Sequence, residues 1–408
     1  MILCLGWHQH VRAQEQQEWV PLPFGTVSYR QNIVPSNRVP IEDRVTYPIG
    51  PRTLVTPSPK ESGWTIRMQV SEQYDDNVQF TPTDKISDFI TSFSPGVHYK
   101  TASPRGYLEV DYMLESALYA QTPEFNDLVE SQAATVAGGY KFSPRDTLTL
   151  FNQFQQFKDP TGQVIPGVLR PRSQFTENVF LLNETHDYSP TTSLHAELRS
   201  FLSLIDDSSA VDSLLNEGYV GFMTEPVETS RIGGDYRLQH YRFDGAPNAF
   251  TQSLFFVHQY RPGKTTRFDW RVGPAFVQND EDTVTAVGGF TFEASLSDFV
   301  AELAFDRDLN TSGGLGSVLL AQTVTLGGRW WAGEKLQLYV GAQASRIEEL
   351  SASGLQFDVL QPFGMMTYAF SPNVVGALRY RYIRQDIRNF PNLTTEANVV
   401  TLSLVGSF

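Results

Sequence analysis

The side chains able to do catalytic or metal chemistry are few, and none has a catalytic spacing. His8 and His10 lie near the N-terminus, and the remaining histidines are His98, His186, His195, His240 and His258. None of them has a metal-ligand spacing, and the sequence contains no G-x-S-x-G, P-loop or H-E-x-x-H motif. Cys4 is the single cysteine, which excludes a disulfide framework. We therefore expect a protein that is not an enzyme and that has no cofactor and no metal site.

Charged side chains instead recur at alternate positions of apolar segments. His195, Glu197 and Arg199 are spaced by two, which in a strand places them on one face. An arginine facing lipid near the bilayer midplane costs about 2 to 4 kcal/mol, so such charges should line the lumen of a barrel. The candidate lumen-lining residues are Arg67, Arg199, Arg237, Arg267, Arg271, Arg329, Arg379 and Arg381, with Glu197, Asp235, Asp269, Glu302, Asp306 and Asp308.

Two roles are open for these lumen candidates. They could pair across neighbouring strands and stiffen a water-filled wall, or they could form rings that guide a polar or anionic solute. Tyr241 and Tyr339 also fall on the inward faces, where they could stack on sugar rings. In the loop 158–172, Arg170 and Arg172 are candidate constriction residues.

Strands are the elements that must position these charges. Trp64, Ile66, Met68 and Val70 alternate with polar residues, which is the period of a half-buried strand. From Trp64 onward such segments recur, which predicts 18 strands. Because this number is even, the start of the first strand and the end of the last strand should lie on the same, periplasmic side of the membrane. The expected strands lie near 63–79, 87–101, 106–120, 130–142, 146–157, 173–188, 191–204, 213–224, 229–243, 249–261, 264–278, 283–295, 298–309, 317–331, 334–348, 355–370, 373–387 and 394–408.

Short and long connections alternate between these segments. An aromatic residue followed by Ser-Pro recurs in YKFSPRDTL (140–148), HDYSPTTSL (186–194) and YAFSPNVVG (368–376), whereas the other connections, such as 121–130 and 388–395, are longer. Short periplasmic turns and long external loops are typical of a transmembrane barrel. We therefore expect an all-β, antiparallel, up-and-down transmembrane β-barrel over residues 63–408. Its terminal Phe408 resembles the signal by which the barrel-insertion machinery recognises outer-membrane proteins.

The N-terminal part of the chain, as far as position 62, has a different pattern. Residues 1–13 are a candidate signal-peptide remnant, ending in a small residue after a short apolar start. Residues 14–62 contain eight prolines and no sustained periodicity, which disfavours helices and sheet interiors. We expect a Pro-rich periplasmic leader there, acting as a flexible segment, a plug or a docking strap for a periplasmic partner.

Composition limits the function classes further. The chain has 45 acidic and 31 basic residues, a net charge of -14, which argues against nucleic-acid binding because phosphate neutralisation needs a basic face. No run of about 18 apolar residues is present, so no transmembrane helix is expected. The expected location is the outer membrane of a Gram-negative bacterium, with outer-membrane lipid around the barrel.

One stretch resembles a known family. In SEQYDDNVQFTPTDKISDFITSFSPGVHY (71–99) the matching residues are Tyr74, Asp76, Asn77, Asp88, Phe89, Ile90, Pro95 and Gly96. They resemble the first hairpin of the outer-membrane β-barrels found alongside exosortase and exopolysaccharide loci, with Y-x-D-N on the first strand and P-G near the second turn. The match is confined to this stretch. The resemblance implies an outer-membrane pore associated with polysaccharide secretion, and it supplies no functional residues.

Four functions follow as hypotheses. The first is an outer-membrane channel that exports an extracellular polysaccharide together with periplasmic polysaccharide-export proteins. The second is a general diffusion porin for small polar solutes. The third is a sheath barrel around an electron-transfer cytochrome, whose haem protein would be a separate chain because no C-x-x-C-H motif occurs. The fourth is a structural surface protein without a transport role.

Overall fold

The computed structural model describes residues 62–159, 168–263, 265–279, 282–311, 314–333, 335–350, 354–371, 373–388 and 393–408. The segments expected at 1–13 and 14–62 therefore lie outside the described residues, apart from residue 62. Among the described residues, no helix has both the length and the apolar character needed to cross a membrane. The one described helix is the three-residue 3-10 helix η2 (Pro123–Phe125).

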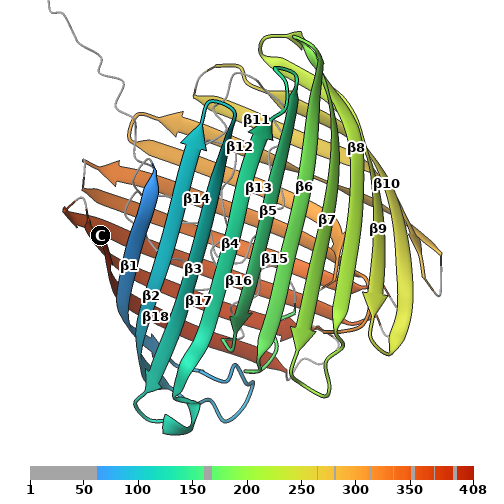
Figure 1. Ribbon diagram of the computed structural model, residues 1–408. Coiled ribbons are helices and arrows are strands. Elements are labelled where there is room, and N and C mark those ends of the chain that lie inside the picture. The colour runs from blue at the N-terminus through green and yellow to red at the C-terminus, as the bar shows by residue number, and fades with distance from the viewer. Residues whose placement is uncertain are drawn as a thin grey trace, which may run out of the picture.

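Eighteen antiparallel strands form one closed sheet, as the alternation of residues predicts (Figure 1). Each strand pairs with its neighbours in the sequence, and β1 also pairs with β18, which closes the barrel. The strands are β1 (Gly63–Asp75), β2 (Asp88–Ser103), β3 (Gly106–Tyr119), β4 (Asp127–Lys141), β5 (Asp146–Phe157), β6 (Phe175–Ser189), β7 (Thr192–Ile205), β8 (Ser213–Val227), β9 (Ser230–Phe243), β10 (Ala246–Tyr260), β11 (Thr266–Gln278), β12 (Thr283–Leu296), β13 (Phe299–Asn310), β14 (Leu319–Ala332), β15 (Leu336–Glu349), β16 (Gln356–Ser371), β17 (Val374–Ile387) and β18 (Thr394–Ser407).

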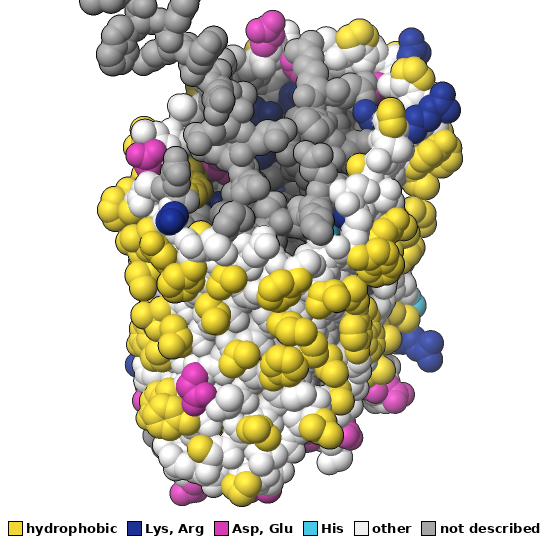
Figure 2. Space-filling model, turned by 60° about the vertical axis from the view of Figure 1, so that its left-hand side comes forward, with side chains coloured by type: hydrophobic (Ala, Val, Ile, Leu, Met, Phe, Trp, Pro, Cys, Tyr) yellow, Lys and Arg dark blue, Asp and Glu magenta, His cyan; other side chains and the backbone are white. Residues whose placement is uncertain are grey.

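The apolar faces of the strands point outward and the polar faces point inward. On β1 the outward Ile66, Met68 and Val70 are exposed, whereas the intervening Arg67 and Gln69 are buried. On the face drawn in Figure 2, the outer surface carries a broad band of hydrophobic side chains, with charged side chains mainly toward the two rims. This inside-out distribution is what a barrel surrounded by lipid requires.

The two ends of the barrel differ in their connections. The turn rim is the end with the short turns, such as 104–105, 142–145 and 190–191, and it also holds the start of β1 and the end of β18. Here Phe408 closes the seam, because its backbone exchanges hydrogen bonds of 2.9 and 3.0 Å with Ile66. The loop rim is the opposite end, with longer connections such as 76–87 and 158–174; β9 and β10 are joined there by only two residues.

Two sequence-based predictions near the first hairpin are wrong. β1 ends at Asp75 instead of residue 79. Beyond Asp75, side chains form hydrogen bonds with backbone groups that would otherwise pair with a neighbouring strand. The Asn77 backbone N–H donates to the Asp75 carboxylate at 2.8 Å, and the Asn77 amide donates to the Thr81 carbonyl at 2.8 Å. Pro95 and Gly96 lie inside β2 instead of near a turn, and a Cβ on Gly96 would meet the Tyr112 carbonyl of β3 at 3.0 Å.

Candidate functional site: the barrel lumen and its loop-rim mouth

The strand register places the predicted lumen residues on the inward faces. Arg67 pairs in register with inward Ser407, Arg237 with Ser253, and Arg329 with Tyr339. The structure brings some of these residues into direct contact and leaves others apart. Arg379 and Arg381 lie on β17, whereas Arg237 and Arg271 lie on β9 and β11, on another part of the wall.

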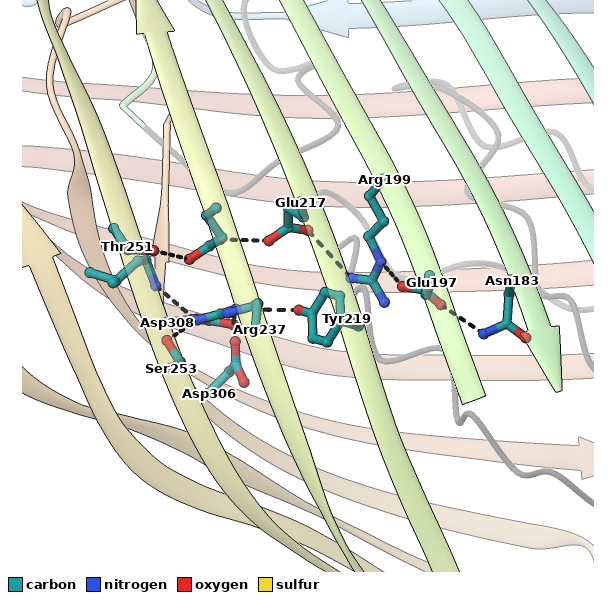
Figure 3. A network of polar contacts seen from close by, with 12 residues as sticks. Asn183, Glu197, Arg199, Glu217, Tyr219, Arg237, Thr251, Ser253, Asp306 and Asp308 are labelled. Carbon is teal, nitrogen blue, oxygen red and sulfur yellow. Dashed lines mark hydrogen bonds and ion pairs between the residues drawn. The ribbon is translucent and has the colours of Figure 1, made fainter. Parts of the chain in front are cut away.

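A chain of polar contacts crosses β6 to β10 on the inner wall (Figure 3). The Asn183 amide contacts Glu197 at 3.4 Å, and Glu197 is paired with Arg199. Arg199 approaches Glu217 at 3.8 Å, and the Gln239 amide donates to Glu217 at 2.5 Å. Each carboxylate therefore has a donor on the same or a neighbouring strand, which offsets the cost of burying its charge.

A second set of contacts connects strands that are not neighbours (Figure 3). Both terminal nitrogens of Arg237 on β9 donate to the Asp308 carboxylate of β13, at 2.9 and 2.6 Å. Arg271 of β11 donates to the same carboxylate at 2.7 Å. β9 and β13 are four strand spacings apart, roughly 19 Å along the wall, so the Arg237–Asp308 pair connects two parts of the inner wall that are separated by three strands. These two arginines and their shared aspartate brace this side of the barrel.

The inward charges of the described strands are segregated by sign. Arginines outnumber acids on the basic wall, formed by β14 to β18 and β1, whereas acids far outnumber bases on the acidic wall, formed by β3 to β8. The basic wall includes Arg67, Arg329, Arg379 and Arg381 with Asp75 and Glu349. The acidic wall includes Glu109, Asp111, Glu115, Glu130, Glu177, Asp187, Glu197 and Glu217 with Lys141 and Arg199. A solute in the lumen would therefore lie between walls of opposite charge.

The mouth loop, residues 168–174, folds inward at the loop rim. The backbone N–H of Leu169 donates to the Gln385 side-chain oxygen at 2.7 Å, and the Gln385 amide donates to the Leu169 carbonyl at 2.9 Å. Leu169 also packs with Phe80, Ile383 and Ala397. The loop leaves the wall between β5 and β6 and reaches β17, six strands away around the barrel. It therefore crosses the mouth.

The two predicted constriction residues hold this loop in place. Arg172 donates to both oxygens of the buried Glu130 carboxylate, at 2.7 and 2.8 Å. Burial alone would lower the pKa of Arg172, but Glu130 raises it, and the net pKa lies above the ordinary value. Arg170 donates to the Gly314 carbonyl at 2.8 Å and approaches Asp207 at 3.8 Å; burial lowers its pKa. Both arginines are thus engaged by neighbouring elements.

Apolar inward residues are the main feature that sequence reasoning missed. A cluster of buried side chains that includes Phe151, Phe201 and Phe255 lies inside the wall. Tyr241 belongs to it, and Tyr339 packs on Phe363 with ring centroids 5.2 Å apart. The two tyrosines are at most 3% exposed, so the interpretation that they offer free faces to sugar rings is wrong in this structure. Alternation along a strand predicts that these tyrosines face inward, but it does not predict which side chains they pack against.

Two further clusters complete the description of the lumen. His98 lies 3.1 Å from Asp111, which is also paired with Arg67, near the turn rim. His195 lies 3.1 Å from Asp235 on the inner wall. Within the described residues, no group of three or more histidine, cysteine or acidic side chains is arranged to hold a metal ion.

Comparison with known proteins gives structural similarity alone. No family model and no curated protein matches the sequence. Among solved structures, OccAB4 from Acinetobacter baumannii is 11% identical with a TM-score of 0.45, covering 86% of this chain and 99% of its own. A BenF-like porin from Pseudomonas fluorescens Pf-5 and the outer membrane protein OpdK from Pseudomonas aeruginosa are each 11% identical with TM-scores of 0.46, covering 85% of this chain and 99% of their own.

Proposed function

We propose that this chain is an outer-membrane channel through which small polar and charged solutes diffuse passively. The observation that carries the proposal is the division of charge between the basic and the acidic wall of a closed barrel. About 18 strands can enclose an aqueous channel, and opposed charges inside it orient a polar solute and favour its hydration. No residue needs to act chemically, since the concentration gradient drives transport.

The outer face supports a membrane location. The outward apolar stretches run from Leu336 to Ala344 on β15 and from Leu360 to Phe370 on β16. A tilted strand needs about 9 to 11 residues to cross a bilayer, and both stretches have this length. The match supports a barrel that spans a membrane, and the outer membrane of a Gram-negative bacterium is the location that barrels of this type occupy.

The mouth loop favours small solutes over a long polymer. Its contacts with β4 and β17 tie it across the entrance, and the ion pair of Arg237 and Asp308 occupies space inside the barrel. Export of an extracellular polysaccharide remains a prediction that depends on the leader and on periplasmic partners. The cytochrome sheath and the surface protein remain alternatives that conductance measurements would separate from a channel.

Ion selectivity in planar bilayers tests the channel directly. We expect the refolded barrel to conduct, and we expect R379Q/R381Q to shift its reversal potential in a salt gradient toward cations, because two positive charges leave the basic wall. The control is R105Q/R145Q, which removes two exposed charges from turns. Absence of conductance, or equal shifts in both variants, would contradict the proposal.

The cost of placing an arginine at different depths on the outward face tests whether a bilayer surrounds the barrel. Val340 lies in the middle of the outward apolar stretch of β15, from Leu336 to Ala344, and is 61% exposed. Val340→Arg should lower the free energy of unfolding from lipid vesicles by about 2 to 4 kcal/mol, whereas Glu348→Arg near the loop rim should cost at most about 1 kcal/mol. Urea titration followed by tryptophan fluorescence measures both. Equal costs at the two depths would argue against a bilayer around this face.

A further inference from the structure

Polar side chains interrupt the outward face of β5 to β8, strands that lie side by side at the front of Figure 1. Asn152 on β5, Ser200 on β7 and Asn216 on β8 point outward, because their neighbours along each strand are buried or face the lumen. The outward residues next to them have no polar side chain: Leu150 and Phe154, Leu198 and Leu202, and Leu214 and Gly218. By contrast, the outward positions of β11 from Phe268 to Phe276 and of β15 from Leu336 to Ala344 are all apolar.

Strand register aligns these polar side chains in one row, which continues to His240 of β9. At one end, the amides of Asn152 and Asn178 exchange hydrogen bonds of 3.2 and 3.5 Å. At the other end, Ser200 donates to Asn216 Oδ1 at 3.0 Å. Among the described residues, the Asn216 amide nitrogen and the His240 ring have no hydrogen-bond partner. Hydrocarbon offers no partner either, so these groups are costly to leave against lipid.

The same side of the barrel has a hollow and projecting side chains. The hollow has a volume of about 410 Å³, lies toward the turn rim and is lined by outward Leu108 of β3, Tyr140 of β4 and Leu148 of β5, among others. On β7 and β8, Leu198 and Val220 project from the surface and are 58% and 55% exposed. The hollow and the projecting side chains lie on either side of β6, so one half of this face has a shape that can receive the other half.

We propose that the outward face of β3 to β9 packs against a second copy of this chain within the membrane. In a cyclic assembly, β7 and β8 of one copy face β3 to β5 of the next, which places projecting side chains opposite the hollow. Polar side chains and close packing are the interactions that hold protein surfaces together in lipid, where apolar contact alone brings no gain over the lipid. This inference rests on the membrane placement in the proposed function, not on conduction.

Two features favour a second copy over lipid or an unrelated protein. An acyl chain can fill the hollow, but it cannot accept a hydrogen bond from Asn216. An amide both donates and accepts, so the amides of Asn152 and Asn216 can pair with the same groups of another copy. The copy also supplies the apolar side chains that fit the hollow, so one occupant accounts for both the shape and the polar groups of this face.

Energy transfer between labelled chains in lipid vesicles tests the polar part of this face. Donor-labelled and acceptor-labelled full-length chains are refolded together, and energy transfer is recorded as the protein-to-lipid ratio changes. We expect the parent chain to associate and S200V/N216L to associate about tenfold more weakly, because the polar contacts between copies are lost. The matched control, T91V/Q322L, removes two outward polar side chains of β2 and β14 and should associate like the parent chain.

A second pair of variants tests the packing of the projecting side chains. L198A/V220A should also associate about tenfold more weakly, because the contacts with the hollow of the next copy are lost. The matched control is L326A/V340A, which shortens two side chains of the neighbouring strands β14 and β15 that are 58% and 61% exposed. This control should associate like the parent chain.

Two outcomes would overturn the inference. A parent chain that stays monomeric at every protein-to-lipid ratio would assign the face to lipid or to another protein. Equal losses in the variants and their controls would show that association does not use this face. Circular dichroism of each sample confirms that the barrel is folded. Conductance recorded on the same vesicles separates the two proposals, since a monomer that conducts contradicts only this inference.

Discussion

Replacing Arg237 with methionine should lower the free energy of unfolding by about 3 kcal/mol. Arg237 is 1% exposed and donates to both oxygens of Asp308, so its loss removes the main partner of a half-buried carboxylate. Breaking a buried ion pair from one side costs about 3 to 5 kcal/mol. We expect the lower end, because Arg271 still donates to Asp308 at 2.7 Å. Urea unfolding in vesicles measures the change.

A control variant and a double variant show whether the loss of stability comes from the Arg237–Asp308 ion pair. R242M removes an exposed arginine five positions along the same strand and should change stability by less than about 0.5 kcal/mol. In R237M/D308N the uncompensated charge disappears, so the double variant should cost less than the sum of the two single variants. If R237M costs no more than R242M, the Arg237–Asp308 ion pair does not contribute to stability.

Glu130→Gln should loosen the mouth loop without unfolding the barrel. Glu130 is 2% exposed and accepts from both Arg172 and the Tyr119 hydroxyl, the latter at 3.1 Å. Loss of its charge removes the carboxylate that Arg172 bonds, while the contacts of the guanidinium with the rings of Tyr119 and Phe125 remain. If this costs about 3 kcal/mol, the open state of the loop becomes roughly 100-fold more populated.

Hydrogen exchange reports that change at individual residues. The amide of Leu169 donates to Gln385, and that of Arg172 donates to the Gln79 carbonyl at 3.1 Å, so both exchange only when the loop opens. We expect both to exchange roughly 100-fold faster in E130Q, with higher single-channel conductance. E124Q, an exposed glutamate on η2, is the control. Unchanged exchange in E130Q would mean that apolar contacts alone hold the loop.

The barrel itself could be predicted from sequence because its signal is local. Alternation every second residue fixes which face of each strand meets lipid, as on β1, where Ile66 and Met68 face outward and Arg67 faces inward. The strand number follows from counting such segments and their turns, and it equals the 18 strands observed. Errors arose at strand ends, as at Asp75, where side-chain hydrogen bonds compete with the ladder.

The partners inside the lumen could not be predicted in this way. Alternation placed Arg237 and Asp308 on inward faces, but their contact joins residues 71 positions apart across three intervening strands. Leu169 and Gln385 meet across 216 positions because a loop turns inward. Tyr241 and Tyr339 likewise face inward as expected, yet they pack against the wall instead of lining an open surface.

Alternation along the chain was enough to predict the closed barrel, its inward and outward faces and the set of charges in the lumen. Which of these charges pair, and which wall the mouth loop contacts, became clear from the folded barrel alone. This difference arises because side-chain orientation follows from the geometry of a single strand. Pairing between strands that are not neighbours depends instead on barrel curvature and loop paths, which arise from all 18 strands together.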